Sequence, residues 1–290
     1  MISAAEVAVR IKRLPIFPEA PARLAALLAQ GSSGVDEFEK VIKPDPGLTA
    51  NLLRLANSAY FGLTRRIASA REAITILGLK RVYDVASMAA MQGFLPARLP
   101  GYELSSDGYW QHCVAVACLA ENMARAGGAH APALVFTAGL MHDIGKLVLG
   151  EFLALHAAPI LEKLRHDGVS LIGAEREILG VDHSEVGAEV AFVWKLPDAV
   201  VSVIRWHHDP SKVPEGVDRS CVDLVHVADA LAHSFGFGAD IGELRRPLDA
   251  QAFDRLKLAV PALELVAAGS LADIESLTGL AKASDRGDKL

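Results

Sequence analysis

Hydrophobic residues recur along this chain mostly at the three- and four-residue spacing of helices, whereas the alternation that is typical of strands is scarce. Alanine and leucine, which favour helices, dominate these periodic segments. The pattern therefore predicts an all-α protein. In the first third of the chain, the predicted helices cover residues 22–29, 35–42, 47–58, 68–77 and 80–94, the last two joined at Gly78.

Residues 96–107 interrupt this pattern with two prolines, a glycine and paired serines. They predict a linker between an N-terminal helical subdomain, residues 1–95, and a second helical unit, residues 108–240. The second unit's predicted helices cover residues 109–126, 131–152, 157–167, 171–179, 184–194 and 222–235, with a further one beginning at Pro197. Residues 241–282 predict covering helices at 248–258, 261–268 and 271–281, and residues 283–290 predict a frayed polar tail.

The composition bounds the class of protein. With 290 residues, 51% of them hydrophobic, the chain can build a sizeable core without disulfides, and its three cysteines form no Cys-x-x-Cys pair. The formal charge of −6 predicts an overall field that repels nucleic acid, and the composition gives no reason to expect a local basic patch. No apolar run approaches the roughly 18 residues of a membrane-spanning helix. We expect a soluble cytoplasmic protein.

Histidine and aspartate residues of the second unit give the clearest indication of chemistry. The candidate metal ligands are His112, His142, Asp143, His183, His207, His208 and Asp229. Imidazole and carboxylate ligands together suit iron, manganese, zinc or nickel, whereas magnesium and calcium prefer oxygen ligands. One ion rarely needs seven ligands, so the set predicts one or two divalent transition metal ions, with Asp143 as the bridge of a binuclear centre.

The alternative is that these residues are ordinary core or surface side chains, because His-Asp and His-His pairs also occur by chance. Their context favours a site. The pair His142-Asp143 ends the apolar segment 136–141, and buried polar groups need partners, which a metal supplies. The other histidines show no comparable context of neighbouring ligand candidates, and we interpret them as surface or core residues: His130, His156, His166, His226 and His233.

The second half of the chain resembles the HD superfamily of metal-dependent phosphohydrolases, which is named after the adjacent His-Asp pair. The order of the candidate ligands is also similar to that of the HD-GYP branch, which hydrolyses cyclic dinucleotides. The chain departs from that branch after His208, because residues 209–216 contain no Gly-Tyr-Pro loop. Gly108 also stands where some trinuclear members have a glutamate, so a third metal is not expected.

The first two-thirds of the chain, roughly, resembles the HDOD domain, a signalling relative of the HD fold. The matching segments are Leu14-Pro15-Ile16-Phe17-Pro18, Ile42 with Asp45-Pro46, residues 52–58 (LLRLANS), residues 73–78 (AITILG), residues 138–146 (AGLMHDIGK), residues 183–188 (HSEVGA) and residues 194–197 (WKLP). This resemblance implies a two-layer helical architecture, with an N-terminal helical subdomain and a C-terminal HD-type bundle. It also implies a bacterial regulatory protein with protein partners, although many members lack part of the HD ligand set that this chain keeps.

A catalytic alternative assigns roles to Asp143 and Lys146. In a metal-dependent phosphohydrolase acting on a nucleotide or cyclic dinucleotide, Asp143 would bridge the metals and Lys146 would steady phosphate charge. Lys146 follows His142 by four residues, so on one helix both would face the same cavity. The other interpretation of Lys146 is a helix-end lysine that binds carbonyl groups. We favour regulation, with hydrolysis as the alternative.

Four further residues have weaker indications of a role near the site. Lys195 and Arg205 are candidates for a phosphate contact, and Glu177 and Glu185 are candidates to orient His183, although each glutamate is equally explained as a solvated helix residue. In the first subdomain, the pair at 57–58 lies beside two aromatic residues, and it either marks a groove between the halves or caps a helix, which is the commoner case.

Overall fold

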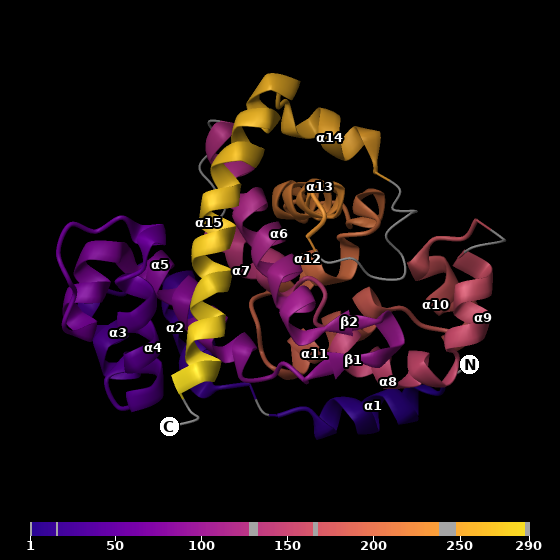
Figure 1. Cartoon of the computed structure of the whole chain (residues 1–290), viewed down its shortest axis with the longest axis horizontal. Helices are drawn as coiled ribbons and strands as arrows, with labels where there is room; N and C mark the ends of the chain where they lie inside the picture. Colours follow the sequence, from indigo (N-terminus) through magenta and orange to yellow (C-terminus); the bar gives the residue numbers. More distant parts are fainter. Residues whose placement is uncertain (1, 16, 128–132, 165–167, 238–247, 288–290) are drawn as a thin grey trace.

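The computed structural model describes residues 2–15, 17–127, 133–164, 168–237 and 248–287 (Figure 1). Helices dominate these residues, and the extended structure among them is one antiparallel pair of two-residue strands, β1 (Arg98–Leu99) and β2 (Leu104–Ser105). The all-α prediction is therefore confirmed. Within the described ranges, no helix combines the length and the apolar character that crossing a membrane requires.

The first layer, on the left of Figure 1, is a compact helical group. It consists of α2 (Glu19–Gln30), α3 (Val35–Ile42), α4 (Pro46–Ala56) and α5 (Ala70–Gln92), with the short 3-10 helix η1 (Ala59–Phe61) before α5. Asp45 begins α4, because its side chain accepts a hydrogen bond from the Leu48 amide at 2.9 Å. Helix α5 is kinked at Gly78, whose φ of 80° is a conformation that favours glycine, so the predicted join at this residue is confirmed.

The first helix, α1 (Ala4–Arg13), belongs spatially to the other half of the molecule. It lies beside α8 (Lys146–Leu155) at the bottom of Figure 1, where the Ile2 amide donates to the Leu179 carbonyl at 2.7 Å and Arg10 pairs with Glu151. Residues 1–13 were predicted to belong to the first subdomain, and no helix was predicted for them. The Ser3–Glu6 capping box begins a helix there.

The segment predicted as a linker is packed into the fold. Its turn, η2 (Pro100–Tyr102), lies against α8 so closely that a Cβ on Gly101 would meet the Gly150 carbonyl oxygen at 2.3 Å. Tyr102 is fully buried, and its hydroxyl donates to Glu175 at 2.8 Å. Residues 96–107 therefore support the second half rather than merely joining two units.

Helix α6 (Ser106–Ala126) is the centre of the second half. Around it are arranged α7 (Val135–Met141), α8 (Lys146–Leu155), α9 (Ala157–Glu162), α10 (Leu171–Leu179), α11 (His183–Val193), α12 (Asp198–Trp206), η4 (Pro210–Lys212) and α13 (Ser220–Ser234). The single helix predicted over 131–152 is wrong. Between α7 and α8 the amides of Ile144, Lys146 and Leu147 bond to carbonyls three residues back, which tightens the chain into a turn.

The chain ends in α14 (Ala250–Leu256) and α15 (Val260–Gly287). Helix α15 runs between the two layers along α6 (Figure 1), where Asn122 donates to Ser270 at 3.0 Å and to Asp273 at 3.1 Å. The separate helices predicted over 261–268 and 271–281 are one helix, which also continues into the predicted tail. The backbone stays helical through Gly269, which lies between the two predicted helices.

An aromatic stack and a group of ion pairs are among the contacts that join the layers. Trp194 stacks on both Phe17 and Phe94, with ring centroids 4.9 Å apart in each pair. On the other side, the buried carboxylate of Glu121 on α6 binds Lys80 and Arg81 of α5, each at 2.5 Å. One continuous hydrophobic core follows from this packing, and it spans both halves.

Candidate metal centre

Five parts of the second half meet at one buried point. Helix α6 contributes His112, the α7–α8 turn contributes His142 and Asp143, and the start of α11 contributes His183. The residues after α12 and the interior of α13 contribute His207, His208, Asp229 and His233. All seven predicted ligands are therefore brought together, and His208 is the one that is half-buried rather than buried.

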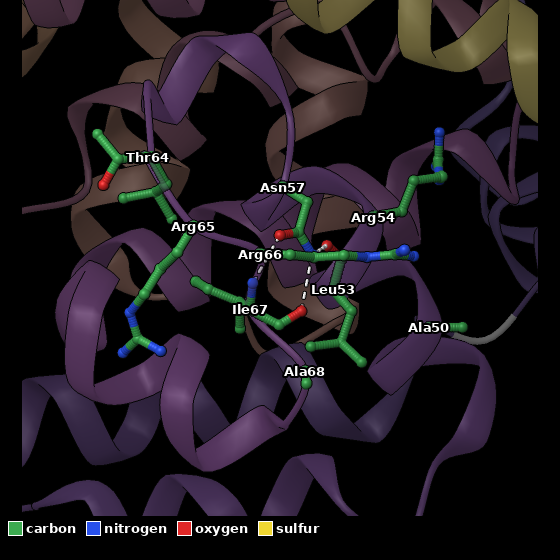
Figure 2. Close-up of a pocket in the computed structure, with 10 residues that line it drawn as sticks. Ala50, Leu53, Arg54, Asn57, Thr64, Arg65, Arg66, Ile67 and Ala68 are labelled. Atoms are coloured by element: carbon green, nitrogen blue, oxygen red, sulfur yellow. Dashed lines mark hydrogen bonds between the residues drawn. The ribbon is translucent and has the colours of Figure 1, made fainter.

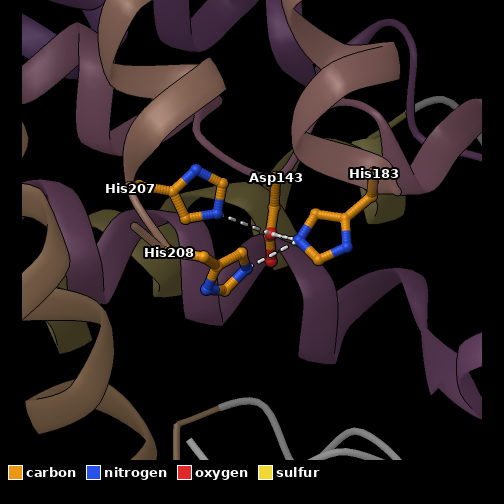
Figure 3. A group of neighbouring side chains, drawn as sticks. All are labelled: Asp143, His183, His207 and His208. Carbon is orange, nitrogen blue, oxygen red and sulfur yellow. Dashed lines mark hydrogen bonds and ion pairs between the residues drawn. The ribbon is translucent and has the colours of Figure 1, made fainter. Parts of the chain in front are cut away.

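The first group of donors surrounds one oxygen of Asp143 (Figure 3). Asp143 Oδ1 lies 3.2 Å from His183 Nε2 and 3.8 Å from His207 Nε2. His208 Nε2 is 2.8 Å from His183 Nε2. Figure 3 shows the three rings around the carboxylate, with His183 coming from the start of α11 and His207 and His208 from the turn after α12.

The second group of donors surrounds the other Asp143 oxygen. Asp143 Oδ2 lies 3.6 Å from His112 Nε2 and 3.4 Å from His142 Nε2. Asp229 Oδ1 approaches the same two nitrogens, at 3.2 and 3.8 Å. The two oxygens of Asp143 thus face different donor groups, which is the position that a bridging carboxylate takes between two ions.

The outer nitrogens of four histidines are fixed by acceptors of the protein. The Nδ1 atoms of His112, His142 and His207 lie 3.1, 2.7 and 2.8 Å from the carbonyl oxygens of Phe237, Gly139 and Ile204. His183 Nδ1 lies 2.8 Å from Glu175 Oε2. These acceptors assign the proton to Nδ1, so each Nε2 faces the centre of the cluster.

This assignment makes the centre rich in electron-pair donors that face one another. The Nε2 atoms of His112 and His142 are 3.3 Å apart beside two carboxylates. Among the described residues, His207 Nε2 and Asp143 Oδ1 are buried without a hydrogen-bond partner, whereas Asp143 Oδ2 forms an ion pair with Lys146. Burying unpaired acceptors is costly, and a metal cation would satisfy several of them together. The residues present therefore fit a divalent transition metal.

Electrostatics support the same conclusion. Burial alone would raise the pKa of Asp143, but the charges of His142 and Lys146 outweigh it and hold this pKa well below its ordinary value. Burial and the neighbouring His142 lower the pKa of His207 to about 3, so its ring is neutral at pH 7. An ionised carboxylate and a neutral imidazole are the forms that bind metals.

His183 differs because a carboxylate lies behind it. Burial lowers the pKa of His183, but the negative charge of Glu175 and the contact with Asp143 outweigh this effect and raise it to about 10. The ring is therefore an imidazolium in the protein alone. A cation would bind Nε2 by displacing its proton, while Glu175 keeps the proton on Nδ1.

Lys146 is buried in the site, with 1% of its surface exposed. Its Nζ lies 2.6 Å from Asp143 Oδ2 and 5.4 Å from the centre of the Tyr102 ring. The prediction that Lys146 and His142 share one helix is wrong, because the turn separates them and Lys146 is the first residue of α8. The lysine still faces the site, as an ion-pair partner of Asp143.

Glu175, which the sequence analysis missed, orients His183. Its carboxylate accepts hydrogen bonds from the His183 backbone amide at 2.9 Å and from the Tyr102 hydroxyl at 2.8 Å. The predicted orienting glutamates are not the ones used: Glu177 pairs with Lys163. A sequence feature could have found Glu175, because it lies on the face of α10 that carries Leu171, Ala174 and Leu179 and is buried there.

His233 is also part of the cluster, and its interpretation as an ordinary histidine is corrected. Its Nε2 lies 3.5 Å from Asp229 Oδ1, and its ring centroid is 4.4 Å from that of His112. The spacing of four residues from Asp229 on α13 was the available sequence feature.

The remaining histidines behave as predicted where they are described. His226 is a core residue: its Nδ1 donates to the His207 carbonyl at 2.6 Å, and its Nε2 accepts from the Asp249 amide at 2.8 Å. His156 ends α8 and is half-buried. His130 and His166 lie outside the described residues. Arg205, a predicted phosphate contact, pairs instead with Glu189 at 2.9 Å.

A close backbone approach positions Asp143 against His183. A Cβ on Gly145 would lie 1.8 Å from the His183 carbonyl oxygen and 2.7 Å from the Gly187 amide nitrogen. Only glycine fits between the α7–α8 turn and the start of α11. Asp182 begins α11 by accepting hydrogen bonds from the Ser184 and Glu185 amides, both at 2.9 Å, so this helix start is fixed.

A cavity of about 410 Å³ lies beside His208. It is lined by His208, Asp209, Pro210, Ser211, Leu248, Asp249 and Gln251. His208, the half-buried member of the donor cluster, is therefore also part of the wall of this cavity.

Comparison with known proteins identifies the family and the fold. Residues 14–210 match the HDOD domain family. An HDOD domain protein of unknown function from Geobacter sulfurreducens superposes with a TM-score of 0.74 at 23% identity, covering 96% of this chain and 97% of the other. A proposed phosphohydrolase from Shewanella amazonensis SB2B gives a TM-score of 0.72 at 23% identity, covering 96% and 98%. A proposed signal transduction protein from Marinobacter aquaeolei VT8 gives 0.71 at 22% identity, covering 96% and 65%.

The curated relatives are longer proteins. An uncharacterised protein of Treponema pallidum is 27% identical over 226 residues, which is 73% of this chain and 41% of the relative. Ribonuclease Y of Aquifex aeolicus is 34% identical over 123 residues, which is 42% of this chain and 16% of the enzyme. The chain thus spans less than half the length of either relative.

Proposed function

This chain belongs to the HDOD family, and we propose that it is a bacterial signal-transduction protein that holds one or two divalent transition metal ions in its second half. It acts in the cytoplasm through protein partners. The proposed ligands are the seven residues predicted from the sequence together with His233: His112, His142, Asp143, His183, His207, His208, Asp229 and His233.

One observation carries the proposal of a metal. Three histidines donate Nδ1 to backbone carbonyls and a fourth donates to Glu175, and all four direct Nε2 at Asp143 or Asp229. Core histidines that serve packing have no reason to aim the same nitrogen at one point. A histidine that binds a metal through one ring nitrogen usually donates the N–H of the other to an acceptor of the protein, as these four rings do.

The two oxygens of Asp143 support a binuclear rather than a mononuclear centre. His183, His207 and His208 would hold one ion, while His112, His142 and Asp229 would hold the other, with His233 beside them. Such ions would supply Lewis-acid chemistry toward a phosphate ester. Lys146 and a metal cation compete for Asp143 Oδ2, so binding a metal would release the ammonium group for another anion.

Metal-dependent phosphohydrolysis is the second candidate function, and the cavity beside His208 favours it. The cavity reaches the donor cluster at its least buried histidine, where a ligand could enter. We nevertheless place regulation first, because residues 209–216 lack the Gly-Tyr-Pro loop of cyclic-dinucleotide phosphodiesterases. A nucleotide is the substrate class for this alternative.

Metal analysis of protein purified without added metal tests the first proposal. We expect one to two equivalents of iron, manganese, zinc or nickel, reduced in His142→Ala and Asp143→Ala. His156→Ala is the matched control, because His156 lies at the end of α8 outside the cluster and its loss should leave the metal content unchanged. Absence of metal even after reconstitution would overturn the proposal.

A turnover screen separates the two functions. Generic phosphodiesters and nucleotides are assayed with the metal-loaded protein and with the same two alanine variants. Turnover that both variants abolish would establish hydrolysis and displace the purely regulatory account. Turnover that survives in both variants comes from a contaminant or another site, and a loaded centre without turnover supports regulation.

A further inference from the structure

A groove of about 1050 Å³ lies in the first layer, which carries none of the metal ligands (Figure 2). It is bounded by α4 and by the loop between α4 and α5. Its lining residues are Ala50, Leu53, Arg54, Asn57, Leu63, Thr64, Arg65, Arg66, Ile67 and Ala68. The volume is at the upper end of the range of small-molecule sites, so a ligand of nucleotide size fits it.

Asn57 holds the loop in a fixed shape. Its Nδ2 donates to the carbonyls of Leu53 at 2.7 Å and Ile67 at 2.9 Å, and its Oδ1 accepts from the Ile67 amide at 2.7 Å (Figure 2). Ile67 itself is buried in the core. The asparagine thus ties together the two ends of a ten-residue segment, and the groove exists before any ligand binds.

The lining of the groove is positively charged. It includes Arg54, Arg65 and Arg66 and no aspartate or glutamate, whereas the whole chain carries a formal charge of −6. This cluster of arginines is opposite in sign to the net charge of the molecule, and the overall composition gave no reason to expect it. A concave surface lined by one sign of charge attracts ions of the other sign.

The three arginines are not equivalent. Arg54 is half-buried and donates to the neutral side chain of Asn51 at 3.2 Å, and burial lowers the pKa of its guanidinium group. An anion bound beside it would offset that desolvation. In Figure 2 the Arg54 and Arg66 side chains extend toward the same side, and Arg65 extends toward the other.

Arg65 is already engaged. Its Nη1 lies 2.5 Å from Glu72, and 70% of the Arg65 side chain is exposed. An exposed ion pair contributes little to stability, so an incoming anion competes with it at low cost. Because the Arg54 and Arg66 side chains extend toward the same side of the groove, we assign them as the main anion contacts and Arg65 as a secondary one.

The remaining lining residues indicate the chemical character of the rest of the ligand. Leu53 and Leu63, which are half-buried, give an apolar wall, and Thr64 adds a hydroxyl to the lining. Guanidinium groups match phosphate oxygens with paired hydrogen bonds, and several of them together favour more than one phosphate. We propose that this groove binds a nucleoside di- or triphosphate, with the phosphates at Arg54 and Arg66 and the nucleoside against the apolar wall.

Calorimetric titration of the full chain with ATP and GTP tests the proposal, in EDTA so that the metal centre takes no part. We expect saturable binding of one nucleotide per chain. Arg54→Gln and Arg66→Gln should each weaken it by about tenfold or more, as for loss of a charge-assisted contact, whereas Arg65→Gln should have a smaller effect. Arg23→Gln, an exposed arginine of α2 paired with Glu19, is the control and should leave the affinity unchanged.

Thermal unfolding of each variant shows that it is folded, so that loss of binding is not loss of structure. Absence of saturable binding by the wild-type chain, or equal binding by wild type and both glutamine variants, would overturn the proposal. Pyrophosphate that binds as tightly as the nucleotides would overturn the nucleoside assignment. Binding of a single-stranded RNA oligonucleotide but not of the nucleotides would overturn it in favour of a nucleic-acid surface.

Discussion

Glu175 lies behind His183, with its carboxylate oxygen 2.8 Å from Nδ1 and its helix packed into the core. The same carboxylate accepts a hydrogen bond from the Tyr102 hydroxyl. Tyr102 of η2, Glu175 of α10 and His183 of α11 therefore form one buried series of hydrogen bonds. These hydrogen bonds fix the His183 ring and the proton on its Nδ1 before any ligand binds.

Replacing Glu175 with glutamine should weaken metal binding by about 10- to 100-fold, the usual effect of losing a partner behind a metal-binding histidine. The pKa of His183 should fall as well, because the charge of Glu175 raises it. Chelator-competition titration measures the first effect, and the histidine resonances in NMR measure the second. Glu177→Gln is the control, since Glu177 pairs with Lys163. Unchanged metal affinity in Glu175→Gln would contradict the proposal that Glu175 orients His183 for metal binding.

A methyl group at Gly145 should displace the site. In Gly145→Ala the new Cβ collides with the His183 carbonyl, so α11 must move away from the Asp143 turn. We expect a loss of at least about 1–3 kcal/mol of unfolding free energy together with loss of metal. Gly269→Ala on α15 is the matched control, because a Cβ there meets open space. It should be neutral or stabilise the helix by up to about 1 kcal/mol. Denaturant unfolding measures the free energy of unfolding of both variants. Equal values would exclude the close approach of the Gly145 backbone to the His183 carbonyl.

The polar contact between the layers should contribute strongly to stability. Glu121 is 1% exposed and binds Lys80 and Arg81, which are themselves partly exposed. Glu121→Gln leaves three cations, Lys80, Arg81 and the more exposed Arg125, without this carboxylate. We expect a loss of about 1–3 kcal/mol, less than for a fully buried pair because water reaches all three cations. Arg23→Gln, at an exposed pair, should change stability by no more than about 0.5 kcal/mol. If both variants unfold alike, Glu121 does not hold the layers together.

Asp84 should make stability depend on pH. It lies between α5 and α7, accepts a hydrogen bond from Thr137 at 3.1 Å, and burial raises its pKa to about 7 despite the charges of Lys80 and Arg81. The folded protein therefore keeps a proton that the unfolded chain releases above about pH 4. Stability should fall as the pH rises from about 4 to about 7.

Asp84→Asn removes this titration and tests it. Thermal unfolding between about pH 5 and pH 8 should show a smaller decrease in melting temperature for the variant than for the wild type. Parallel profiles would mean that Asp84 is ionised in the folded protein at every pH in this range.

The members of the donor cluster were predictable because several of them are polar residues in segments that are otherwise apolar. His142 and Asp143 follow six apolar or small residues, and Asp229 stands between Val227 and Leu231. Gly78 and the bounds of α3 and α10 were predictable for similar local reasons. In each of these cases neighbouring residues along the chain contain the information.

What could not be predicted depends on contacts between distant segments. Glu175 and Glu177 are equivalent in an isolated helix, and only the packing of α10 decides which one meets His183. The place of α1 depends on contacts with α8, and Gly145 is required only because α11 lies against it. The arginine groove arises where Asn57 ties a loop back onto α4.

The central claim is that the donors around Asp143 hold metal ions, and anomalous X-ray diffraction from crystals grown with manganese tests it most directly. The account predicts one or two anomalous peaks between the Asp143 carboxylate and the Nε2 atoms of His112, His142, His183 and His207. Manganese found only at the surface, with the centre empty in crystals whose histidines keep this arrangement, would contradict it.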